Sequence, residues 1–255
     1  STNLAGNFSS PWLDGVVAAA FLAIACTFFV AIFNVRSFIP ACLLSFCIVS
    51  FPTTTSIYTY MFNSSQDFLA LLLVVLAAWL FRRGRTVTNL LGVLSVACSM
   101  GLYQAFFCLT AAILALTMII DVCNGRWKSN LKKFFITGIH YLEWLALGLL
   151  LYLAITKVCL WCTGVKLVDY QGISSMGQVT LPILIQRIKE IYPQLVDYYF
   201  NNPMYPRSFP FLVLVSLLAD ILVIGILLFT HHLHKNILNL LQLAIMLIIF
   251  PIACN

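Results

Sequence analysis

Eight long apolar runs constrain the fold of this chain more than any other feature of its sequence. They cover approximately residues 12–35, 38–51, 67–81, 87–101, 104–120, 134–157, 209–230 and 237–255. At about 1.5 Å per residue, each run crosses or nearly crosses a hydrocarbon core of about 30 Å. Only 9% of the residues are charged, whereas a soluble domain carries about a quarter. The sequence therefore predicts an all-α, polytopic helical membrane protein with about eight transmembrane helices.

The connections between these runs alternate in charge. Basic residues follow every second run, as Arg36, the RRGR segment at 82–85, four residues between 126 and 133, and Lys235. The short connections on the opposite side contain no Lys or Arg and cover residues 1–11, 52–66 and 102–103. The positive-inside rule predicts that the basic side is cytoplasmic. Residue 1 and the loops at 52–66 and 158–208 are then predicted to be extracytoplasmic.

The loop at 158–208 is the only long connection, and it contains an amphipathic stretch at about 181–199. Its apolar residues recur every three or four positions, as Leu181, Leu184, Ile188, Ile191 and Leu195. This pattern predicts a helix that lies in the membrane interface. Pro193 is expected to kink this helix or break it in two. The alternative is a small extracellular helix that packs on its own domain.

The connection at 52–66 is unusually rich in hydroxyl and aromatic side chains for so apolar a chain. Pro52 is predicted to end the preceding helix, and the hydroxyl groups at 53–56 can satisfy the freed backbone groups. Tyr58, Tyr60 and Asp67 then permit two interpretations. One is an aromatic-belt turn followed by an acid at a helix N-terminus. The other is a substrate-facing rim on which Asp67 accepts a proton from a hydroxyl group.

Three ionisable residues are predicted to lie at membrane depth, where a charge is costly. His140 and Glu143 are three residues apart and are predicted to form a local pair near the cytoplasmic end of their helix. Asp220 is predicted to face the bundle, either as a structural residue or as part of a polar pathway. A pathway would indicate a transporter or flippase, but no pair of spans is interrupted by Gly or Pro as such proteins favour.

Other motifs give weaker signals. HHLHK at 231–235 has no supporting Cys or Asp, so no metal site is predicted. The CLWC motif, with Cys159 and Cys162, is interpreted as two helix-end thiols, with a short-range disulfide as the alternative. The net charge of +6 is dispersed among the loops and does not indicate nucleic-acid binding.

Three stretches resemble the membrane glucosyltransferases of the Gtr-II type, which glucosylate O-antigen. They are SSPWLDGVVAAAFLAIA, SFPTTTSIYTYMF followed by DFLALLLVVLAAWLFRR, and SMGLYQAFFCLTAAILAL. The likeness is best over residues 9–120, and from 134 onward only the hydropathy pattern is shared. The resemblance implies a GT-C-like fold in a bacterial inner membrane. The family's acidic motif precedes the Ser-Pro-Trp segment, so residues 1–255 are expected to be a single transmembrane domain cut from a longer chain.

The resemblance also implies a reaction. A sugar, glucose by the family's example, would pass from a polyprenyl-phosphate donor to a cell-surface glycan on the outer face of the membrane. Asp67 is predicted to be the catalytic acid residue, with Asp14 as the second candidate. The predicted phosphate contacts are the loop cations Arg207, Lys166, Arg187 and Lys189. The predicted sugar contacts are Tyr58, Tyr60, Tyr103 and Gln104.

The expected partners are membrane lipid, the polyprenyl-phosphate sugar, the polysaccharide acceptor, and membrane proteins that make and flip the donor. A divalent cation is an optional cofactor in this scheme, with no ligand assigned. Two alternatives stay open: a transporter or flippase with a midplane site around Asp220, and a non-catalytic membrane subunit.

Overall fold

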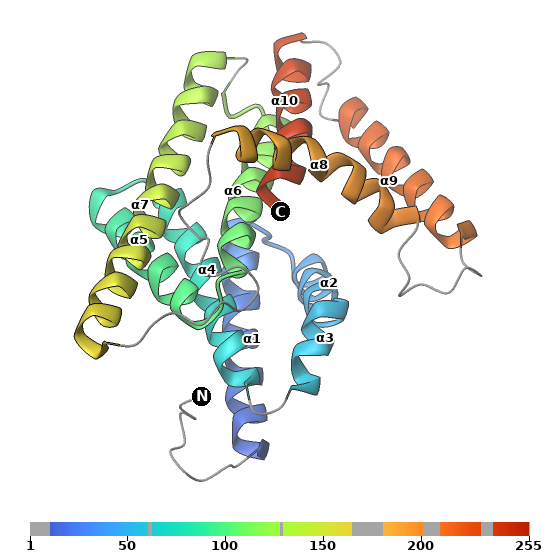
Figure 1. Ribbon diagram of the computed structural model, residues 1–255. Coiled ribbons are helices and arrows are strands. Elements are labelled where there is room, and N and C mark those ends of the chain that lie inside the picture. The colour runs from blue at the N-terminus through green and yellow to red at the C-terminus, as the bar shows by residue number, and fades with distance from the viewer. Residues whose placement is uncertain are drawn as a thin grey trace. The chain divides into compact units, whose positions relative to one another are not determined.

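The computed structural model describes residues 11–60, 63–127, 130–164, 181–200, 210–230 and 237–254. Every regular element in these ranges is an α-helix (Figure 1), which confirms the all-α prediction. The helices are α1 (Pro11–Ile32), α2 (Phe38–Val49), α3 (Pro52–Thr59), α4 (Ser64–Arg83), α5 (Thr86–Leu102), α6 (Phe106–Cys123), α7 (Leu131–Thr163), α8 (Leu181–Phe200), α9 (Pro210–Thr230) and α10 (Ile237–Cys254).

Helix length and composition identify the chain as a membrane protein. Four helices, α1, α4, α6 and α7, are long and apolar enough to cross a bilayer, and α2 with α3 adds a fifth if this bent pair is one span. α5 is a shorter apolar helix of 17 residues, which is about 25 Å long. The described residues thus support four or five candidate spans. The eight predicted spans are not shown: α2, α5 and α10 are short, and α9 is not among the candidate spans of the described residues.

The chain divides into two compact units, and each is described by itself. Unit 1 contains residues Ser1–Thr117 and Thr137–Val158, and unit 2 contains Met118–Ile136 and Cys159–Asn255. Unit 1 therefore includes α1 to α5, the first part of α6 and the middle of α7.

In unit 1, α1 and α4 pack side by side and run in the same direction. The Ser65 hydroxyl donates to Asp14 Oδ1 over 3.3 Å near the start of both helices. At the other end, Arg82 Nη1 donates to the Ile32 carbonyl over 2.8 Å. Small residues such as Ala18 and Ala78 are fully buried in the core of this unit. Small side chains let helix backbones approach closely, which is how membrane helices gain dispersion energy.

Two bent helices connect α1 to α4. α2 and α3 meet at an angle of 51°, and Pro52 is the first residue of α3. A proline at position 52 has no N–H for the Ile48 carbonyl four residues earlier. The Thr54 hydroxyl replaces it and donates to that carbonyl over 2.8 Å. The sequence prediction of a turn here is wrong, because residues 52–59 form a helix that the proline starts.

Two glycines set the packing of α5 and α7 in unit 1. A Cβ on Gly92 of α5 would lie 2.5 Å from the Phe81 ring of α4. A Cβ on Gly148 of α7 would lie 2.8 Å from Val96 Cγ1 of α5. Both contacts exclude a larger residue without repacking. They fix α5 between α4 and α7.

Unit 2 contains α8, α9 and α10. The Tyr192 hydroxyl of α8 donates to the Ile248 carbonyl of α10 over 2.6 Å, and Ile191 and Met246 are buried. α8 confirms the predicted helix at about 181–199, although its interfacial position stays a prediction. Pro193 lies inside α8, so the alternative in which the helix breaks in two is wrong.

Candidate functional site

The starts of α1 and α4 bring both predicted catalytic acids to one end of unit 1, which we name the acid end. Asp14 lies in the first turn of α1 and Asp67 in the first turn of α4. Asp14 is only 7% exposed and accepts the Ser65 hydroxyl, whereas Asp67 is partly exposed. First-turn carboxylates are favoured by the positive end of the helix dipole. The two acids therefore share a location but differ in access to the surface.

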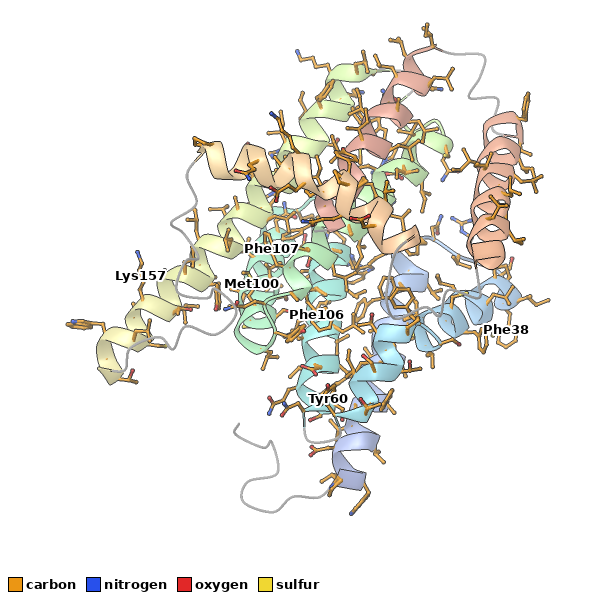
Figure 2. All side chains as sticks on the ribbon, turned by 45° about the vertical axis from the view of Figure 1, so that its right-hand side comes forward. Phe38, Tyr60, Met100, Phe106, Phe107 and Lys157 are labelled. Carbon is orange, nitrogen blue, oxygen red and sulfur yellow. The ribbon has the colours of Figure 1, made fainter. Side chains whose placement is uncertain are left out.

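The predicted aromatic contacts lie at the same end. The Tyr58 ring of α3 lies 4.8 Å from the ring of Phe68, the residue after Asp67. Tyr60 caps the end of α3 and is 71% exposed. Figure 2 shows Tyr60 near the start of α1. α3 thus places one aromatic ring in the packing and one at the surface beside the acid end.

The connection between α5 and α6 adds to this end of unit 1. The Ser99 hydroxyl, near the end of α5, donates to the Ala70 carbonyl in the second turn of α4 over 2.9 Å. Gln104 Nε2 donates to the Tyr152 hydroxyl oxygen of α7 over 2.5 Å. Tyr103 is half exposed, and its ring packs edge-on against Phe106 at 5.2 Å.

Apolar side chains pack beside the connection between α5 and α6. Met100, Phe106 and Phe107 lie together where α5 gives way to α6 (Figure 2), and all three belong to the core of unit 1 or pack against it. Tyr103 and Gln104 are therefore held by core packing on one side and by Tyr152 on the other.

The four predicted phosphate-binding cations lie outside unit 1, and nothing in the described residues tests their role. Lys189 is exposed on α8 in unit 2. Arg187 also belongs to α8, but the position of its side chain lies outside the described part. Lys166 and Arg207 fall in residues that the structure does not describe. Their contact with a donor phosphate stays a prediction.

The ionisable residues within the apolar runs have mixed outcomes. His140 Nδ1 and Glu143 Oε2 are 2.7 Å apart and both side chains are exposed, so the predicted local pair is confirmed. Asp220 lies in α9, but its side chain is outside the described part. Cys159 and Cys162 near the end of α7 are free thiols.

The opposite end of unit 1, which we name the arginine end, carries Arg36, Arg82, Arg83 and Arg85. Arg82 donates to the Ile32 carbonyl, and the Arg83 guanidinium lies 3.8 Å from the centre of the Trp79 ring. Arg36 Nε donates to Asn34 Oδ1 over 3.4 Å. The basic and acidic residues that the sequence places on opposite sides of the membrane thus lie at opposite ends of unit 1.

Sequence reasoning missed two residues of the acid end, Ser65 and Tyr152. Ser65 is 2% exposed and bonded to Asp14, while Tyr152 holds Gln104. In the sequence, the signal for Ser65 is its position two residues before Asp67, a candidate acid. No local signal in the apolar run around Tyr152 points to Gln104, because 48 residues separate the two.

The acid end carries a partly exposed carboxylate, Asp67, a buried carboxylate, Asp14, and aromatic and amide side chains from α3 and from the connection between α5 and α6. Such an arrangement can accept a proton from a hydroxyl group and can contact a sugar.

Comparison with known proteins identifies the family of the chain. No curated protein and no solved structure matches the chain. A family model described as glucosyl transferase GtrII matches residues 2–255, which extends the resemblance beyond residue 120. The chain belongs to the GtrII glucosyl transferase family.

Proposed function

We propose that this chain transfers glucose from a polyprenyl-phosphate donor to a cell-surface glycan on the outer face of the bacterial inner membrane. Membership of the GtrII family supports the sugar and the reaction class. One structural observation carries the assignment of the site: the acid end gathers Asp67, Asp14 and Tyr58 from three helices and Gln104 from the connection between α5 and α6.

In this reaction Asp67 accepts the proton of the acceptor hydroxyl while its oxygen attacks the anomeric carbon of the donor glucose. The bond between that carbon and the phosphate oxygen breaks, and polyprenyl phosphate leaves with the electron pair. The growing negative charge on the phosphate calls for cations. Lys166, Arg187, Lys189 and Arg207 are the candidates for that task.

The charge asymmetry of unit 1 supports the outer face. The arginine end carries Arg82, Arg83 and Arg85, and the positive-inside rule assigns it to the cytoplasm. The acid end is then extracytoplasmic, as a lipid-linked donor and a surface glycan require. The bond between Ser99 and Ala70 holds α5 antiparallel to α4, which supports a further membrane crossing by α5. We extend this proposal to α9 and α10. The eight proposed membrane crossings are then α1, α2, α4, α5, α6, α7, α9 and α10.

The function is tested with the full chain in membranes, radiolabelled polyprenyl-phosphate glucose and an O-antigen acceptor. We expect transfer of label to the glycan. Asp67→Asn should lower the rate by about 10²- to 10⁴-fold, the usual contribution of a general base, with unchanged membrane insertion. Arg83→Gln at the arginine end is the matched control and should keep the wild-type rate. Full activity of Asp67→Asn would remove Asp67 from the mechanism.

A further inference from the structure

Asp14 and Asp67 have different surroundings, although the sequence offers both as catalytic acids. Asp14 is 7% exposed and its Oδ1 already accepts the Ser65 hydroxyl. An acceptor sugar could reach this carboxylate only if α1 and α4 moved apart. Asp67 is partly exposed, so a hydroxyl group can approach it without such a movement.

The bond between Ser65 and Asp14 fixes the rotation of the first turn of α4. Successive residues of an α-helix are about 100° apart, so Asp67 lies about 200° around α4 from Ser65. With Ser65 bonded to α1, Asp67 must face away from α1. The next residue, Phe68, is fully buried against the core and stacks near Tyr58, which fixes the same turn from a second direction.

The hydrogen bond is shielded from water. It is longer than a usual O–H···O bond at 3.3 Å, but it joins two buried side chains from helices that pack along their length. Loss of the Ser65 hydroxyl would leave the Asp14 carboxylate buried without this donor. The start of α4 would then rotate or separate from α1, and Asp67 would move with it.

We infer that Ser65 and Asp14 form a positioning pair, which holds the first turn of α4 so that Asp67 faces the substrate. This inference rests on the proposed function, in which Asp67 is the base. Asp14 acts through Ser65 and does not itself take the proton. Ser65 is therefore a positioning residue, and Asp67 alone is the catalytic carboxylate at this end.

The test compares four variants of the full chain in membranes with polyprenyl-phosphate glucose as donor. Ser65→Ala should lower kcat by about 10- to 100-fold, the range that a small misplacement of a reacting group causes, with little change in KM for the donor. Asp14→Asn should stay within about threefold of wild type, because its amide oxygen still accepts from Ser65. Ser95→Ala, which removes a bond within α5 alone, is the matched control and should match wild type.

A double variant separates positioning from general destabilisation. If Ser65 acts through Asp67, Ser65→Ala should cause no further loss in a chain that already carries Asp67→Asn. The acid limb of the pH profile should remain in Asp14→Asn and disappear in Asp67→Asn. Three results would each overturn the inference. The first is a wild-type kcat in Ser65→Ala, and the second is a loss from Ser65→Ala in the Asp67→Asn chain as large as in the wild type. The third is loss of the acid limb in Asp14→Asn.

Failure of the inference and failure of the proposed function give different results. A wild-type chain that transfers no glucose overturns both. An active wild type in which Asp14→Asn is as inactive as Asp67→Asn, while detergent-solubilised protein remains folded, overturns the inference alone and gives Asp14 a direct part in the reaction.

Discussion

The two ends of unit 1 are built on the same parallel pair of helices, yet they use their polar groups differently. At the arginine end, the cations are engaged with the protein: Arg82 with the Ile32 carbonyl and Arg83 with the Trp79 ring. At the acid end, Asp14 is engaged with Ser65, while Asp67 remains partly exposed. The polar groups of the arginine end thus join α1 to α4. Those of the acid end also join the two helices, and in addition Asp67 is partly exposed at the surface.

The packing of α5 differs in the same way along its length. Gly92 lies against the Phe81 ring, next to the arginine end. Gly101 lies near the acid end, and a Cβ there would meet no described atom within 4 Å. Gly92 thus occupies a closely packed position on α5, whereas Gly101 occupies an open position on the same helix.

The sharpest way to break this comparison is to enlarge the two glycines of α5. Gly92→Leu should lower the free energy of unfolding by about 3 kcal/mol, because the new side chain overlaps the buried Phe81 ring. Gly101→Leu, the matched variant, should change it by less than about 0.5 kcal/mol. Unfolding by SDS in mixed micelles measures both. Equal losses at the two positions would mean that the ends are packed alike.

The next largest effect is expected from Arg82→Met. Ile32 is 2% exposed, and the substitution removes the guanidinium that donates to its carbonyl. A buried acceptor left without its donor costs about 1–3 kcal/mol, so the same titration should show a loss of about 2 kcal/mol. Arg85→Gln, on an exposed residue, is the control. A stable Arg82→Met protein would show that the arginine end does not hold α1 against α4.

A smaller effect is expected from Thr54→Val, which keeps the shape of the side chain but removes its hydroxyl. The Ile48 carbonyl then loses the donor that replaces the missing proline N–H. We expect a loss of about 1 kcal/mol, since hydrogen bonds between membrane helices contribute modestly. Thr54→Ser retains the hydroxyl and should restore most of the stability. No difference between the two variants would contradict this role of the hydroxyl.

The smallest effect is expected from Arg83→Gln, which removes the cation over Trp79. Exposed cation–π pairs contribute about 0.5–1 kcal/mol, and Arg83 is exposed. The free energy of unfolding of this variant should fall by about 0.5 kcal/mol. Its rate of glucosyl transfer should equal that of the wild type. A large loss of transfer would mean that the arginine end takes part in the reaction, and the comparison of the two ends would fail.

Much of the fold could be predicted because apolar length is a strong signal. The runs at 12–35 and 67–81 correspond to α1 and α4, and the amphipathic spacing at 181–199 corresponds to α8. α3 was missed because a row of hydroxyl residues after a proline is typical of a turn. In the structure these hydroxyls bond back to carbonyls three residues earlier, as Thr55 does to Pro52, and this is compatible with a helix.

The site was predictable only in part. Asp67 and Asp14 could be identified because acids are rare in so apolar a chain, and each begins a helix. Their different access to the surface could not be predicted, since it depends on α1 packing against α4. Likewise, the bond between Gln104 and Tyr152 depends on the position of α7, which hydropathy does not specify.

The hydroxyl of Thr54 has a consequence for how the membrane part of unit 1 can move. A proline within a helical segment is a common position for a kink. Here the Thr54 hydroxyl is bonded to the Ile48 carbonyl across the interruption, and the Phe51 N–H donates to the same carbonyl over 3.4 Å. The bend at Pro52 is thus held by one bond from each side of the proline, and α3 keeps the Tyr58 ring against Phe68.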